Sequence, residues 1–102
     1  MKIGTDIIRI SRVDRACENE HFRVRVYTDE ELEYCKTAQS FAGLYAAKEA
    51  YLKALGVGIE RKLNTIEISH DEKGKPFLKG VENSDLSISH DGDTAIATVI
   101  LW

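Results

Sequence analysis

The sequence lacks the features of a membrane or secreted protein. No hydrophobic run is long enough to span a bilayer, and the N-terminus has neither the apolar core nor the small-residue cleavage site of a signal peptide. Only two cysteines occur, Cys17 and Cys35, and they lack the spacing of metal ligands. We therefore expect free thiols in a reducing compartment, the cytoplasm, and no contact with a membrane.

Excess positive charge and a glycine-rich phosphate loop are also missing. The 14 Lys and Arg residues against 17 Asp and Glu residues give a net charge of −3, which argues against a general nucleic-acid binder. No P-loop motif is present, which excludes the enzymes built on one. The 102 residues, 43% hydrophobic, predict one domain spanning 1–102, with a small core that oligomerisation would supplement.

The chain is organised around residues 41–56, FAGLYAAKEAYLKALG, which predict a helix of about four turns. Ser40 is the expected N-cap, and Gly56 the expected end. Apolar side chains at helical spacing predict a buried stripe made of Phe41, Leu44, Tyr45, Leu52 and Leu55.

Three shorter helices are expected before this one. The first covers residues 12–19 with Ser11 as its N-cap, and the second, a short turn or helix, covers 21–26. The third opens on a capping box formed by Thr28 and Glu31 and runs to about residue 37.

Strands are expected at both ends of the chain. Residues 2–10 alternate in polarity as a strand does, and residues 65–79 and 85–101 indicate two hairpins, the second turning at Asp91-Gly92. The apolar last strand should be central. Residues 57–64 are a predicted loop. The fold class is therefore α+β, a mainly antiparallel sheet packed against one long helix and shorter helices.

Two carboxylates suggest a metal site. Asp6 shares a strand face with Ile8 and Ile10 at the core boundary, where it either hydrogen-bonds nearby backbone or binds a cation. If the long helix packs across the sheet, Glu49 can meet Asp6, and two carboxylates without His or Cys suit Mg²⁺. Lys48 and Lys53 are then interpreted as phosphate-binding cations. The plainer alternative is a surface ion pair between Glu49 and Lys53.

Three further features have both a plain and a functional interpretation. His90 is either a surface histidine at a turn or a donor to phosphate. Arg12 and Arg15 form either a solvated helix face or a dock for an acidic partner. Ile68-Ser-His-Asp and Ile88-Ser-His-Asp echo each other, which is weak support for a duplication because strands entering turns favour these residues.

Motifs in this order along nearly the whole chain resemble those of the holo-acyl-carrier-protein synthases, a small group of the phosphopantetheinyl transferase superfamily. They are Gly-Thr-Asp-Ile (4–7) with Ile10 and Arg12, Phe41-Ala, Ala47-Lys-Glu-Ala with Lys53-Ala-Leu-Gly, Gly74-Lys-Pro, and Ser87-Ile-Ser-His. The resemblance implies Mg²⁺-dependent transfer of 4′-phosphopantetheine from coenzyme A to a serine of apo acyl carrier protein, releasing 3′,5′-ADP.

The same resemblance implies residue roles. Asp6 and Glu49 would bind the metal on the pyrophosphate, and Lys53 would stabilise or protonate the leaving phosphate. Coenzyme A would touch Gly74, Lys75, Pro76, Ser89 and His90. Arg12 and the basic first helix would meet the carrier, in a homotrimer with active sites between subunits. The base that deprotonates the serine stays open between Glu49 and water on the metal.

Two departures from the family pattern stand out. Leu44 occupies a position where members often carry an arginine that meets coenzyme phosphate, so that Lys36, Arg61 or Lys62 would have to substitute. Glu18 and Glu20 make the first helical region less basic than usual, which suggests altered docking of the carrier. Two other functions are carried as alternatives: a Mg²⁺-dependent hydrolase of nucleotide pyrophosphates, and a non-catalytic module that binds the carrier.

Overall fold

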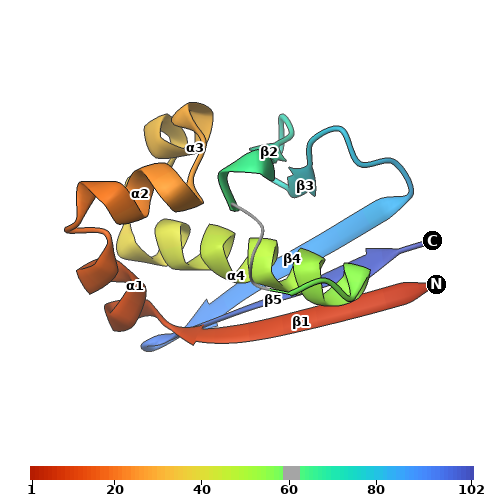
Figure 1. Ribbon diagram of the computed structural model, residues 1–102, viewed down its shortest axis with the longest axis horizontal. Coiled ribbons are helices and arrows are strands. Elements are labelled where there is room, and N and C mark those ends of the chain that lie inside the picture. Colours follow the sequence, from red (N-terminus) through yellow and green to blue (C-terminus); the bar gives the residue numbers. More distant parts are fainter. Residues whose placement is uncertain (59–62) are drawn as a thin grey trace.

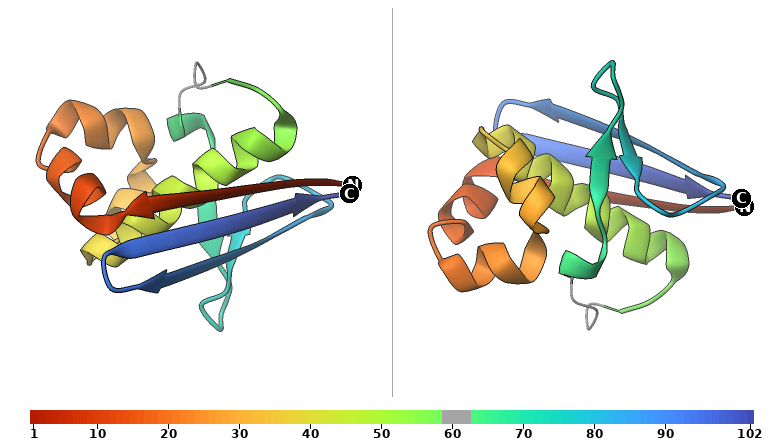
Figure 2. Two further views of the ribbon diagram at one scale, coloured as in Figure 1. Left: turned by 90° about the horizontal axis from the view of Figure 1, so that it is seen from below. Right: turned by 90° about the horizontal axis from the view of Figure 1, so that it is seen from above.

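A long helix, α4 (Ala38–Leu55), lies between a sheet and a layer of smaller elements (Figure 1). The computed structural model describes residues 1–58 and 63–102. The sheet contains β1 (Lys2–Arg9), β4 (Ser84–Asp91) and β5 (Thr94–Leu101). Opposite it lie α2 (Glu20–Val26), α3 (Asp29–Tyr34) and the hairpin of β2 (Ile68–His70) and β3 (Pro76–Leu78), as both views in Figure 2 show.

Two small elements complete the described part of the chain. The helix α1 (Ile10–Ala16) follows β1 directly, and the 3₁₀ turn η1 (Leu63–Thr65) precedes β2. The predicted loop at 57–64 falls partly on residues 59–62, outside the described residues. Across residues 1–58 and 63–102, no helix combines the length and the apolar character that crossing a bilayer requires.

The strand order is β1-β5-β4, and both pairings are antiparallel. The apolar last strand is therefore central, as predicted, and its Ala95, Ala97 and Val99 are buried. The register pairs Gly4 with Val99 and Asp6 with Ala97. The expected α+β class, with an antiparallel sheet against one long helix, is confirmed.

Gly4 is the point where β1 touches α4. A Cβ atom built there would lie 2.0 Å from the carbonyl oxygen of Ala50 and 2.6 Å from the amide nitrogen of Ala54. Both neighbours are helix backbone, which cannot swing aside as a flexible side chain does. The missing side chain therefore allows β1 to lie directly on α4, with Asp6 two residues further along the same face.

The long helix begins earlier than predicted. Thr37, not Ser40, is the N-cap, and its side chain accepts a hydrogen bond from the Ser40 amide at 3.1 Å. Both residues are good caps, three positions apart, so the sequence alone does not choose between them. The predicted end at Gly56 is confirmed, because this residue closes the helix in the left-handed region at φ 74°.

The first helix is capped from outside its own segment. The helix α1 begins at Ile10, and the predicted N-cap Ser11 lies inside it. Asp93, in the turn between β4 and β5, accepts hydrogen bonds from the Ser11 amide at 2.8 Å and the Ser11 hydroxyl at 2.6 Å. This cap could not be predicted from the neighbouring residues, because Asp93 is 82 positions away in the sequence.

Candidate active site

Asp6 and Lys53 meet where β1 lies on α4. The Nζ atom of Lys53 is 3.0 Å from Oδ1 of Asp6 and 3.1 Å from the carbonyl oxygen of Thr5. The Asp6 side chain is 14% exposed, whereas that of Lys53 is 55% exposed. Lys53 thus pairs with Asp6, and not with Glu49 as the plainer interpretation of the helix had it.

Glu49 lies on α4, one turn before Lys53, and is half-buried. Its pKa is raised from the ordinary value, first because burial disfavours the charged form and second because the Asp6 charge repels it. Lys53 offsets part of this effect. The charge of Asp6 therefore acts on Glu49, although the two residues are 43 positions apart in the sequence.

A divalent cation fits this donor set. Among the described residues, no group of three or more His, Cys, Asp or Glu side chains could hold a metal ion, so the protein would supply at most part of the coordination shell. Mg²⁺ usually takes only one or two protein carboxylates and fills its other positions with water and substrate phosphate. Asp6 and Glu49 supply two hard oxygen donors whose mutual repulsion a cation would relieve.

The prediction that Lys48 binds phosphate is wrong, because its side chain has no exposed surface. Its ammonium group lies 2.5 Å from Oε1 of Glu31 and 2.6 Å and 3.1 Å from the carbonyl oxygens of Val26 and Leu63. Burial lowers the pKa of Lys48, and Glu31 opposes the shift. These contacts make Lys48 a structural residue that joins α3 to α4.

Glu31 is the other half of this junction. The predicted capping box is confirmed, with the Thr28 amide donating to Glu31 Oε1 at 2.9 Å and the Glu31 amide donating to Thr28 at 3.2 Å. Glu31 Oε2 also accepts the backbone amide of Ile68 at 2.7 Å. The single Glu31 carboxylate therefore caps the start of α3, accepts a hydrogen bond from β2 and pairs with the buried Lys48 ammonium group.

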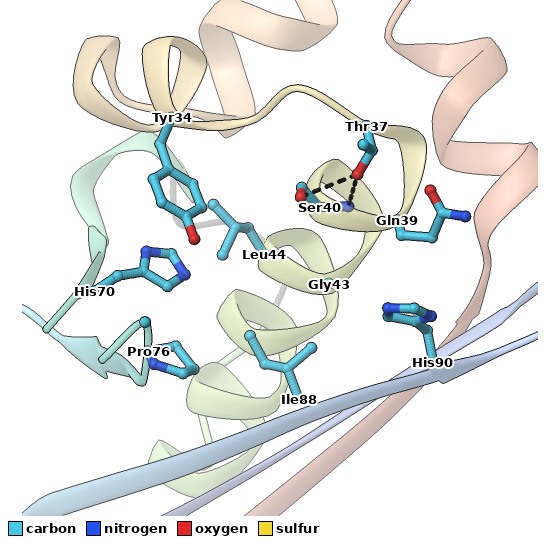
Figure 3. A pocket seen from close by; sticks show the side chains of 11 residues that line it. Tyr34, Thr37, Gln39, Ser40, Gly43, Leu44, His70, Pro76, Ile88 and His90 are labelled. Carbon is cyan, nitrogen blue, oxygen red and sulfur yellow. Dashed lines mark hydrogen bonds between the residues drawn. The ribbon is translucent and has the colours of Figure 1, made fainter. Parts of the chain in front are cut away.

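Several of the predicted coenzyme contacts do gather around one pocket (Figure 3). It has a volume of about 220 Å³ and is lined by Gly74, Pro76 and His90, among others. Leu44 and Ile88 form an apolar floor in this view. Three segments far apart in sequence, the start of α4, the β2–β3 turn and the end of β4, thus share one hollow.

Lys75 and Ser89 do not line this pocket. The Lys75 ammonium group lies 2.7 Å from Oδ1 of Asp85 and 3.3 Å from the carbonyl oxygen of Leu86. Ser89 is exposed and, being next to His90 on β4, points to the opposite face of the sheet. Of the proposed substitutes for the family arginine, Lys36 is exposed, and Arg61 and Lys62 lie outside the described residues.

Tyr34 and His70 also line the pocket, and sequence reasoning did not assign them. Their rings stack with centroids 3.9 Å apart and planes 11° apart. The repeated Ile-Ser-His-Asp was the available signal, since its two histidines, His70 and His90, reach the same pocket from different strands. In the sequence this repeat was only weak support for a duplication, because turn chemistry also accounts for it.

The predicted docking residues Arg12 and Arg15 are both exposed on α1. Arg12 borders a shallow hollow together with Ile7, Arg9 and Thr94. Two arginines and an isoleucine that is 66% exposed thus lie at one end of the sheet.

Comparisons with known proteins identify the family. A family model described as the 4′-phosphopantetheinyl transferase superfamily matches residues 2–99. A holo-[acyl-carrier-protein] synthase from Nautilia profundicola is 46% identical, with 97% of each chain covered. The crystal structure of the Helicobacter pylori holo-[acyl-carrier-protein] synthase in complex with coenzyme A has a TM-score of 0.88 at 33% identity, covering 98% of this chain and 99% of that one.

A further structure agrees. The Bacillus anthracis holo-(acyl-carrier-protein) synthase in complex with CoA (3′,5′-ADP) has a TM-score of 0.82 at 36% identity and covers 96% of this chain and 92% of that one. The chain therefore belongs to the 4′-phosphopantetheinyl transferase superfamily and is a transferase. Within that superfamily its relatives are the holo-[acyl-carrier-protein] synthases, as the sequence motifs indicated.

Proposed function

We propose that the protein transfers 4′-phosphopantetheine from coenzyme A to a serine of apo acyl carrier protein in a Mg²⁺-dependent reaction that releases 3′,5′-ADP. The observation that carries this proposal is the contact between Lys53 and Asp6 where β1 lies on α4, with Glu49 one helical turn from Lys53 and its pKa raised by burial and by the Asp6 charge. The names of the relatives, and the coenzyme bound in the Helicobacter pylori structure, support the choice of substrates.

Phosphoryl transfer of this kind depends on charge neutralisation and in-line positioning more than on covalent help from the protein. Mg²⁺ would supply Lewis-acid stabilisation of the diphosphate, with Asp6 and Glu49 as its protein ligands. Lys53 is exposed enough to move its ammonium group from Asp6 to the leaving phosphate, where it would balance charge or donate a proton. Glu49 is the candidate in this chain for accepting the serine proton, and water is the other acceptor.

The nucleotide end of coenzyme A would bind in a pocket separate from the place where the reacting phosphorus lies. Gly74, Pro76 and His90 line one pocket, which supports contacts to the nucleotide end. Lys75 and Ser89 lie outside that pocket, so their proposed contacts would form beside it or across a subunit boundary. Binding the nucleotide end of coenzyme A in this pocket would position its diphosphate beside the carboxylates of Asp6 and Glu49.

The carrier and the assembly complete the proposal. Arg12 and Arg15 would attract an acidic carrier and guide its serine to the site. The outer face of the sheet exposes Ile3, Ile7 and Ile96 by 68%, 66% and 40%. This exposed apolar face supports contact with another subunit, as the proposed homotrimer with sites between subunits requires. The free thiols of Cys17 and Cys35 support a cytoplasmic location.

Mass spectrometry of an apo carrier incubated with coenzyme A and Mg²⁺ tests the proposal. We expect the carrier to gain about 340 Da, the phosphopantetheine mass that the proposed reaction implies. Asp6→Ala and Glu49→Gln should abolish the gain without unfolding the protein, while Glu33→Gln, an exposed acid on α3, should not. Wild-type rates in Asp6→Ala or Glu49→Gln would refute the metal role.

The same assay separates the two alternatives. A hydrolase would release 3′,5′-ADP from coenzyme A with no carrier present. A binding module would keep its carrier affinity in Glu49→Gln and would modify no carrier at any metal concentration. Either result would replace the proposed transferase reaction.

A further inference from the structure

The pocket of Figure 3 has walls of contrasting chemistry. Tyr34, His70 and Pro76 lie along one side, while Gln39 and His90 lie on the other. Among the described residues that line it, none is an aspartate or glutamate, in a chain that contains 17 of them. The volume, about 220 Å³, is below the roughly 300–1,000 Å³ of sites for drug-sized ligands, so the pocket suits one part of coenzyme A.

The stacked pair Tyr34–His70 separates this pocket from an acidic hollow. Both rings also line a second depression, whose other side chains include Glu30, Asp71 and Glu72. A phosphate near that depression would meet three carboxylates, which repel it. An uncharged flat group is not repelled, and it can lie against the aromatic wall.

His70 is suited to stacking rather than to binding an anion. Its pKa lies below the usual value because burial disfavours the charged ring, although Asp71 and Glu31 act in the opposite direction. Burial therefore favours the neutral imidazole, which has no positive charge with which to attract an anion. In the described part of the chain its ring makes one aromatic contact, with Tyr34, at an interplanar angle of 11°.

We propose that the Tyr34–His70 pair is the wall on which the purine base of coenzyme A packs, making both residues specificity determinants for the nucleotide end of the donor. The inference rests on the proposed use of coenzyme A. The base would lie between this wall and the floor of Leu44 and Ile88, and its phosphate would point toward His90. Flat aromatic surfaces are the usual partners of nucleobases in proteins because every base has a π face.

Calorimetric binding with three probes tests this assignment: coenzyme A, dephospho-coenzyme A, and 4′-phosphopantetheine, which has no nucleotide. Tyr34→Ala and His70→Ala should weaken coenzyme A and dephospho-coenzyme A by the same factor, roughly 5- to 150-fold, the loss expected for one stacked base. Binding of 4′-phosphopantetheine should not change. His70→Phe, which keeps a flat ring without nitrogen atoms, should bind like the wild type.

Other outcomes would overturn the assignment. Loss of coenzyme A affinity without loss of dephospho-coenzyme A affinity would mean that His70 binds the phosphate. A defect in His70→Phe as large as that in His70→Ala would show that a nitrogen atom, not the ring face, is needed. His21→Ala, which removes an exposed histidine on α2, is the matched control and should bind normally. Melting temperatures of all variants identify any loss caused by unfolding.

The inference and the proposed function can fail separately. If the wild type binds coenzyme A but the Tyr34 and His70 variants bind it equally well, only the assignment of the wall is wrong. If the variants lose affinity but the wild type never modifies a carrier, only the transferase reaction is wrong. A wild type that does not bind coenzyme A would overturn both.

Discussion

Replacing Lys48 by methionine tests whether this lysine is structural. The ammonium group has three acceptors within 3.1 Å, and both it and the Glu31 carboxylate are fully buried. Removing one partner of a buried pair leaves the other charge uncompensated, at a cost of about 3–5 kcal/mol. For a domain of this size each kcal/mol lowers the melting temperature by about 4–8 °C, so we expect a fall of at least about 12 °C.

The loss should depend on pH in a defined direction. In Lys48→Met the buried Glu31 carboxylate no longer has a cation beside it, so its negative charge is uncompensated inside the protein. Protonating this carboxylate at low pH removes that charge, so the cost of the substitution grows as the pH rises. The variant should therefore be closest to the wild type near pH 4 and furthest from it near pH 8. Adding Glu31→Gln should make the difference independent of pH in this range.

Urea denaturation followed by circular dichroism at several pH values measures both effects. Lys36→Met, at an exposed lysine, is the control and should change stability by less than about 0.5 kcal/mol. Coenzyme A affinity of the folded Lys48→Met protein should equal that of the wild type. Unchanged stability together with lost coenzyme affinity would show that Lys48 binds phosphate and would refute the reasoning.

Four further substitutions test other parts of the structure. Gly4→Ala should displace β1 from the Ala50 carbonyl and lower the free energy of unfolding, measured by urea denaturation, by about 1–3 kcal/mol. It should also abolish carrier modification, and normal activity would show that β1 can shift without harm to the site. Arg12→Glu should weaken carrier binding in surface plasmon resonance and leave coenzyme A binding intact, and equal defects in both would mean that this surface is misassigned. Ile7→Asp should shift the protein toward monomers in light scattering, because this side chain is 66% exposed, and an unchanged mass would exclude the sheet face as the interface. Thr28→Ala should cost about 1 kcal/mol of stability through the lost cap, and a neutral effect would mean that Glu31 alone holds the start of α3.

Features encoded within a few residues were predictable from the sequence. The capping box of Thr28 and Glu31, the tight turn between the last two strands and the helix end at Gly56 all depend on near neighbours, and all three are present. The turn lies one residue later than predicted, at Gly92-Asp93, because Asp91 still pairs with Thr94. The face of β1 that carries Asp6 was also predicted correctly, because alternation placed Asp6 with Ile8 at the core boundary, and both residues are half-buried.

Contacts between distant segments were not predictable in the same way. Lys48 was taken for an active-site cation because its partner Glu31 is 17 residues away and nothing local shows that both are buried. The pairing of Lys53 with Asp6 spans 47 residues. Tyr34 and His70 were missed for the same reason, since neither residue is unusual in its own segment.

The pairing of β1 with β5 also governs when the site can form. Residues 2–9 hydrogen-bond to residues 94–101, so β1 cannot pair until a strand far along the chain has been synthesised. Until β5 has left the ribosome, Asp6 lies on a strand without its hydrogen-bonded neighbour, and the Asp93 cap of α1 does not yet exist. Enzymatic competence should therefore arise abruptly, once residues 94–101 are present, rather than gradually as the chain grows.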